Sequence, residues 1–166
     1  MAIKRPAPPS ERISASLFKE LADSAARLNS GSDELAKAIR PIEATLKKLN
    51  LGVSAWYIYS GSEEPDSDGN YSYRRIGYAK VGGKWGLALS SGLGNVYADV
   101  DSYDVWLFND APRSMRLESI DCIPDLLEQL VKESNKVAED LQKKAGLARE
   151  LAETISALSA TAEAGR

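Results

Sequence analysis

Over the first third of the chain, apolar residues recur three or four positions apart, a spacing that predicts amphipathic helices. Two helices are expected, because Asn29-Ser30-Gly31 interrupts the pattern with residues that tolerate the left-handed conformation of a helix end. The connection is short, so we predict an antiparallel helical hairpin over residues 10–50. Residues 1–9 contain three prolines and no apolar period, and we expect a disordered lead-in there. The apolar positions of the two helices are Ile13, Leu17, Leu21, Ala25 and Leu28, then Leu35, Ile39, Ile42, Leu46 and Leu49.

The middle of the chain, residues 53–108, is rich in aromatic and β-branched residues and predicts an antiparallel sheet of three to five strands. Gly82-Gly83 suits a two-residue turn in which both positions need a positive φ. That turn sets a register in which Ile76 lies opposite Leu89. Strand residues alternate between the two faces of a sheet, so the register also selects a core face. The predicted core face carries Ile76, Tyr78, Trp85, Leu87 and Leu89.

Two stretches of turn-forming residues predict loops within this middle region. Residues 60–70 are polar and acidic, and Gly92-Leu93-Gly94-Asn95 combines glycine with asparagine. The strands are therefore expected at 53–59, 71–81, 84–91 and 103–108, and residues 96–100 are a candidate for a further short strand.

Residues 112–162 are rich in helix-forming residues and predict the C-terminal helices. The last of them, residues 124–162, would span roughly 58 Å. Pro124 fits its first turn if Asp121 caps the helix start. Its first part can cover the sheet, and its second part can pack beside the hairpin as a three-helix bundle. The alternative is a coiled coil with another subunit. We expect the bundle, because four small residues stand where a strong zipper carries Leu or Ile: Ala148, Ala152, Ser159 and Ala162.

Together these elements predict an α+β fold in a single domain, residues 10–164. The N-terminal hairpin, the antiparallel sheet and the long C-terminal helix would share one continuous core.

The composition narrows the chemistry. There is no histidine, which excludes Ser-His and Cys-His nucleophilic pairs and every metal site that contains imidazole. The net charge of −3, from 21 basic and 24 acidic residues, is too balanced for general nucleic-acid binding. No run of 18 apolar residues occurs, so no membrane contact is expected, and we predict a cytoplasmic protein.

Two features invite a chemical interpretation that their surroundings do not support. Cys122 is the only cysteine, and the neighbouring Asp121 disfavours its thiolate, so we interpret it as structural. Clustered carboxylates suit Ca²⁺ or Mg²⁺, but their spacing here matches no EF-hand loop, so we expect neither a metal nor a cofactor. The cluster consists of Asp99, Asp101, Asp104 and Asp110.

Aromatic residues and arginines supply the candidate binding site. Of the 12 aromatics, 11 lie between Val53 and Phe108, which exceeds what one core face needs. Exposed aromatics could stack a nucleotide base or take a peptide, and arginines bind anions. In the competing interpretation, aromatics of neighbouring strands fill the space over Gly77 and Gly86. The candidate residues are Trp56, Tyr73, Arg74, Arg75, Trp85, Trp106, Arg113 and Arg116.

The first functional hypothesis is a small, non-enzymatic binding or adaptor protein that contacts another protein through its helical face or its aromatic sheet face. A homodimer through the C-terminal helix is one form of this hypothesis. The alternative is a protein that binds or senses a small anionic or nucleotide-like ligand. The observation that distinguishes these two hypotheses is whether the arginines converge beside exposed aromatic side chains. An enzyme comes third, because no catalytic motif is present.

Overall fold

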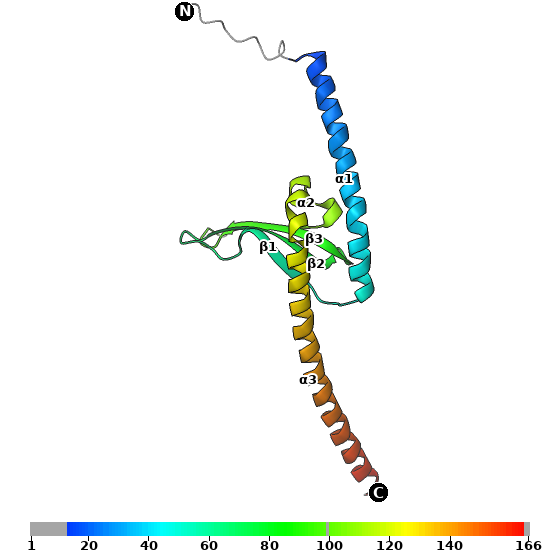
Figure 1. Cartoon of the computed structure of the whole chain (residues 1–166). Coiled ribbons are helices and arrows are strands. Elements are labelled where there is room, and N and C mark those ends of the chain that lie inside the picture. The colour runs from blue at the N-terminus through cyan, green and yellow to red at the C-terminus, as the bar shows by residue number, and fades with distance from the viewer. Residues whose placement is uncertain (1–12, 99, 165–166) are drawn as a thin grey trace, which may run out of the picture. The chain divides into compact units, whose positions relative to one another are not determined.

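The computed structural model describes residues 13–98 and 100–164. The chain divides into two compact units, Met1–Thr45 and Leu46–Arg166. Its helices and strands are shown in Figure 1. In chain order they are α1 (Ala15–Leu49), β1 (Ala55–Ser62), β2 (Asn70–Val81), β3 (Lys84–Asn95), β4 (Val100–Leu107), the 3-10 turn η2 (Phe108–Asp110), α2 (Arg113–Ser119), the 3-10 turn η3 (Ile120–Cys122) and α3 (Ile123–Ala164). Mixed helix and antiparallel sheet agree with the predicted fold class.

The predicted N-terminal hairpin is wrong, because α1 is one continuous helix of 35 residues. It passes through Asn29-Ser30-Gly31 without a break. A glycine inside a helix costs only about 1 kcal/mol relative to Ala, and good helix formers lie before and after this polar stretch, at Ala25-Ala26-Arg27-Leu28 and Glu34-Leu35-Ala36-Lys37. Gly31 also has open space where a side chain would stand. The residues therefore tolerate a helix end but do not impose one. The predicted lead-in, residues 1–9, lies outside the described residues.

The sheet has four antiparallel strands in the order β1-β2-β3-β4. The turn at Gly82-Gly83 has φ values of 55° and 82°, and it produces the predicted register, with Ile76 opposite Leu89. The predicted core face is confirmed, since Ile76, Leu87 and Leu89 are fully buried. Trp85 on the same face is half-buried and stacks on Tyr78, with ring centroids 5.5 Å apart.

The loop predicted at Gly92-Leu93-Gly94-Asn95 is wrong, because β3 continues through Asn95. In this stretch Gly92 pairs with Tyr73 of β2 and Tyr103 of β4. A Cβ on Gly92 would stand 2.5 Å from the Tyr73 ring. Glycine at this position makes room for an aromatic ring in the sheet and does not turn the chain.

The core of the second unit lies where α3 meets β1 and β2. Leu126 and Leu130 of α3 are buried, as are Phe108 of η2 and Met115 of α2. Pro124 stands in the first turn of α3, as predicted, where the missing N–H has no helical partner.

Helix α3 has two parts with different surroundings. We call residues 123–134 the proximal part, which contains Leu126 and Leu130, and residues 135–162 the distal part. Every residue of the distal part is exposed except the half-buried Gly146. The predicted three-helix bundle needed two N-terminal helices beside α3, and the described N-terminal residues form a single helix, α1.

Candidate functional site

Arg74 and Arg75 lie on opposite faces of the sheet, because neighbouring residues of a strand alternate between faces. Arg74 lies on the core face with Ile76, and Arg75 on the other face with Tyr73 and Gly77. Each arginine is held by a different set of partners, described in turn below. They do not form one joint anion site.

Arg75 is the centre of an aromatic cluster, which we call the Arg75 cluster: Trp56, Glu63, Tyr73, Arg75 and Tyr103. The guanidinium carbon lies 4.6 Å from the Trp56 ring centroid, 5.0 Å from that of Tyr73 and 5.8 Å from that of Tyr103. Its Nη1 donates to the Glu63 carboxylate, and Nη2 donates to the Tyr103 hydroxyl at 3.4 Å. Only 17% of the Arg75 side chain is exposed. Each cation–π contact contributes about 0.5–1 kcal/mol at an exposed site and more when desolvated.

The aromatic rings of this cluster cover the glycines of the sheet. A Cβ on Gly77 would stand 2.3 Å from the Trp56 ring, so Trp56 lies flat across that position. Tyr73 lies over Gly92 in the same way. The interpretation that aromatics fill the space over Gly77 is confirmed, and for Gly86 it stays a prediction. The positions of Gly77 and Gly92 are therefore covered by the protein's own aromatic side chains, and the Arg75 guanidinium lies against the rings of Trp56 and Tyr73.

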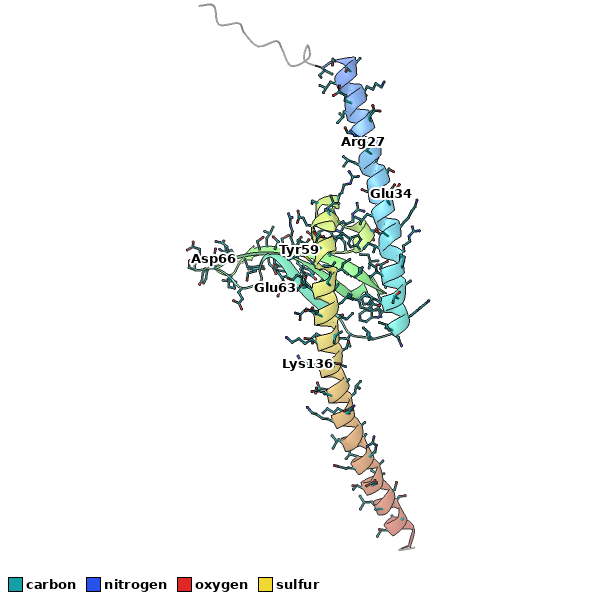
Figure 2. The ribbon with its side chains drawn as sticks, in the orientation of Figure 1. Arg27, Glu34, Tyr59, Glu63, Asp66 and Lys136 are labelled. Atoms are coloured by element: carbon teal, nitrogen blue, oxygen red, sulfur yellow. The ribbon has the colours of Figure 1, made fainter. Side chains whose placement is uncertain are left out.

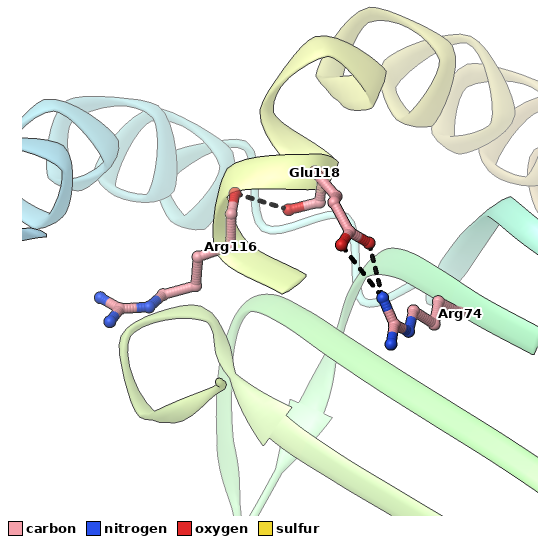
Figure 3. Close-up of polar contacts among 4 residues, drawn as sticks. Arg74, Arg116 and Glu118 are labelled. Atoms are coloured by element: carbon pink, nitrogen blue, oxygen red, sulfur yellow. Dashed lines mark hydrogen bonds and ion pairs between the residues drawn. The ribbon is translucent and has the colours of Figure 1, made fainter. Parts of the chain in front are cut away.

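Arg74 forms an ion pair with Glu118 of α2 (Figure 3). A single nitrogen, Nη1, donates to both carboxylate oxygens, at 2.8 Å and 3.1 Å. The two side chains are 44% and 46% exposed, so the pair is worth at most about 1 kcal/mol. Figure 3 also shows the guanidinium of Arg116 pointing away from this pair.

A groove of about 290 Å³ adjoins Arg74 on the sheet and the start of α2. It brings together three of the predicted residues, Tyr73, Arg74 and Trp106. Arg113 and Arg116 do not line it. Hydroxyl groups and apolar side chains supply much of the remaining wall: Ser72, Ser91, Ser114, Leu93 and Met115. Trp85 lines a separate hollow of about 200 Å³ together with Tyr78, Lys47 and Asn50.

The eight predicted residues are thus spread over several places. Trp56, Tyr73 and Arg75 meet in the Arg75 cluster, while Arg74 and Trp106 share the groove with Tyr73. Sequence reasoning missed Glu63 and Tyr103 as members of the cluster. The pairing of Tyr103 with Gly92 places it on the Arg75 face, so the β3–β4 register was the missing signal.

A buried hydroxyl lies near the beginning of α3. Tyr59 sits at an irregularity of β1, where the pairing with β2 shifts between Ile58 and Ser60 (Figure 2). Its Oη has no hydrogen-bond partner among the described residues. Burial, reinforced by the Glu118 carboxylate, raises the pKa of Tyr59 to about 12. A phenol that stays protonated and lacks a partner is no general base at neutral pH.

The remaining candidate groups show no reactive arrangement. Burial raises the pKa of the Cys122 thiol, and the carboxylates of Asp125 and Asp121 raise it further. Asp101 accepts a hydrogen bond from the Tyr71 hydroxyl at 2.5 Å. Within residues 13–98 and 100–164, no three acidic or cysteine side chains are grouped to hold a metal ion. Asp99, part of the predicted acidic cluster, lies outside that range.

Both long helices expose apolar side chains at helical spacing. We call the exposed apolar residues in and just before the first half of α1 the α1 face: Ile13, which precedes the helix, and Leu17, Phe18, Leu21 and Leu28 within it, which are 52% to 70% exposed. We call those of the distal part of α3 the α3 face: Val137, Leu141, Leu147, Leu151, Ile155 and Leu158, which are 38% to 66% exposed. Large apolar side chains gathered on one side of a helix mark an interaction surface more often than scattered ones do.

Comparisons with protein-family models, with curated proteins and with solved structures find no match to this chain. Among the described residues, no helix combines the length and apolarity that crossing a membrane requires.

Proposed function

We propose that the protein is a non-enzymatic adaptor that binds other proteins through the apolar faces of its two long helices. One observation carries the proposal: the α1 face and the α3 face leave eleven large apolar side chains between 38% and 70% exposed. An amphipathic helix draws most of its stability from packing its apolar face against a partner. Recognition of a helix by a complementary apolar surface uses this same spacing of anchors.

The helices are better placed for this role than the sheet. On the face opposite the core, Trp56 and Tyr73 already lie over glycines, and Arg75 with Glu63 holds the rings together. A partner at that face would first have to displace these contacts. We place the adaptor in the cytoplasm, since a lone cysteine with a raised pKa gives no sign of an oxidising compartment.

Two charge substitutions in α1 test the proposal. Leu21→Glu places a carboxylate in the α1 face, whereas Ala26→Glu adds the same charge to the same helix away from that stripe. The immobilised full chain is exposed to an extract of its own cells. We expect wild type and Ala26→Glu to retain the same proteins and Leu21→Glu to lose them. Retention that is equal for both variants, or absent for all three, would contradict the adaptor function.

A second candidate function rests on the groove beside Arg74. Trp106 offers a ring, three serine hydroxyls offer hydrogen bonds, and Arg74 uses only one nitrogen on Glu118. This composition suits a small anionic or nucleotide-like ligand. If it is the function, nucleoside phosphates raise the melting temperature of the wild type but not of Arg74→Gln. A screen without any stabilisation would exclude it.

A further inference from the structure

The distal part of α3 carries a seven-residue repeat of the kind that builds coiled coils. In the usual notation the first and fourth positions of each repeat, a and d, form the seam. The a positions are Leu141, Ala148, Ile155 and Ala162, and the d positions are Val137, Lys144, Leu151 and Leu158. All eight side chains are exposed.

This seam continues the stripe that the proximal part of α3 already buries. Leu130, one repeat before Val137, is 3% exposed, and Leu126, one helical turn earlier, is fully buried beside the seam. Leu127, two repeats before Leu141, is 39% exposed. An apolar seam that repeats every 3.5 residues drifts around a straight helix. It stays against a second helix over several turns only when the two helices supercoil around each other. The distal part thus has the apolar repeat of a helix that packs in a coiled coil, while the residues of that repeat are exposed.

We propose that the α3 face pairs with the α3 face of a second copy of this chain, in antiparallel orientation. The inference rests on the proposed function and names the partner of one of its two faces. Lys144 decides the orientation. In a parallel pair each Lys144 would face Lys144 of the second copy, which places like charges in the seam. In an antiparallel pair with its centre between residues 149 and 150, Lys144 faces Ile155 instead.

That centre also matches side-chain sizes along the seam. Leu141 lies opposite Leu158 of the second copy, and Ala148 lies opposite Leu151. Val137 lies opposite Ala162, so every alanine of the seam receives a larger residue. The two-fold axis repeats each of these layers, as in other isologous dimers. The alanines that weaken a parallel zipper are therefore complementary in this arrangement.

Small residues beside the seam allow the two helices to approach closely. The fifth position of the repeat, e, is occupied by Ala138, Ala145, Ala152 and Ser159. In this frame Ala152 and Ser159 flank the seam and do not stand in it, which corrects the expectation from the sequence. In most coiled coils charged residues stand there and select the partner. Here the antiparallel register brings Ala138 near Ser159, and Ala145 near Ala152, of the second copy. No charge has to be desolvated on that side.

The antiparallel register is also compatible with the packing of the second unit. The paired stretch runs from Val137 to Ala162, which is the exposed part of the seam. Leu126 and Leu130 stay buried in the second unit, so dimer formation requires no rearrangement of its core. The stretch that pairs in the self-complementary register is the same stretch that is exposed. This agreement favours a second copy of the chain over an arbitrary apolar partner.

The mass of the full chain in solution tests the pairing. Sedimentation equilibrium over a concentration series is expected to show twice the chain mass of 18.0 kDa. Leu151→Glu places a carboxylate beside the two-fold axis in both copies and is expected to raise the dissociation constant by about 100-fold or more. Gln142→Glu adds the same charge on the polar side of the helix and should leave the dimer intact. Circular dichroism verifies that both variants remain folded.

Spin labels test the orientation. In a Cys122→Ser background, one label replaces Lys136 and, in a separate sample, one replaces Glu150. The antiparallel register separates the two labels at 136 by about 40 Å along the axis. It separates those at 150 by little more than the interaxial distance of about 8–10 Å plus the label arms. Equal short distances at both sites would overturn the antiparallel arrangement.

A wild-type chain that is monomeric at every concentration would overturn the pairing altogether. The proposed function has its own test on α1, so the two can fail separately. If Leu21→Glu still abolishes partner capture while the chain is monomeric, only the dimer is excluded. If the dimer forms and no protein is captured through the α1 face, the adaptor function fails and self-association stands.

Discussion

Helix α3 carries one apolar stripe along its length, yet its two parts have opposite surroundings. In the proximal part, Leu126 and Leu130 are buried in the core of the second unit. In the distal part, Leu151 and Leu158 continue the same spacing at 53% and 66% exposure. The comparison shows that periodicity reports which side of a helix is apolar, but not what covers that side. The apolar side of a helix can pack against the same chain or against another chain.

The largest expected contrast comes from truncating one leucine in each part. Leu126→Ala removes a fully buried side chain and should lower the free energy of unfolding by about 2–5 kcal/mol. Leu151→Ala removes an exposed one and should change it by less than about 0.5 kcal/mol. Urea unfolding followed by tryptophan fluorescence measures both, because all three tryptophans lie in the sheet. The measurement belongs at concentrations below any self-association, since a dimer would add stability of its own. Similar losses in the two variants would show that the distal part is packed within the chain.

A matched pair of glycine substitutions sharpens the same contrast at smaller magnitude. A Cβ on Gly77 would stand 2.3 Å from the Trp56 ring and 2.8 Å from the Ala55 carbonyl oxygen. Gly77→Ala should therefore cost about 1–3 kcal/mol in urea unfolding, as overpacking does. Gly146 has open space around it, so Gly146→Ala should favour the distal helix by about 1 kcal/mol. This gain is expected as higher helicity in circular dichroism. A neutral Gly77→Ala would mean that Trp56 does not lie over the sheet.

Local patterns in the sequence were sufficient for the elements whose cause is local. The Gly82-Gly83 turn needs positive φ at both positions, so it determined the β2–β3 register and the core face in advance. Pro124 in the first turn of α3 was predictable for the same kind of reason. By contrast, Gly31 and Gly92 permit a helix end or a turn without requiring one, and there the expected breaks were wrong. A glycine that merely tolerates a break therefore predicts the local structure less well than one that a turn requires.

The candidate site was less predictable than the fold. Trp56, Tyr73 and Arg75 do meet, but Glu63 comes from the start of the β1–β2 connection and Tyr103 from β4. Their approach depends on sheet registers that no local turn specifies. The exposed state of the α3 face was also outside the reach of sequence, because the same stripe is compatible with a bundle and with a coiled coil.

The smallest expected effect concerns the hydroxyl of Tyr59, near the beginning of the proximal part. Its Oη is buried without a hydrogen-bond partner among the described residues, so Tyr59→Phe should stabilise the protein by about 1 kcal/mol at pH 8. The pKa of about 12 in the folded state exceeds the ordinary value of 10.0. Above pH 10 the unfolded chain loses this proton while the folded chain keeps it, so wild-type stability falls as the pH rises toward 12.

The phenylalanine variant lacks that loss, and its advantage over the wild type should widen across this interval. Urea unfolding at pH 8, 10 and 11.5 measures the difference between the two proteins. Tyr97→Phe is the control, since Tyr97 is 78% exposed and its loss should leave stability nearly unchanged at pH 8. A gap that stays constant with pH would mean that the Tyr59 hydroxyl reaches solvent. The proximal part of α3 would then be less firmly seated on β1 than the burial of Leu126 indicates.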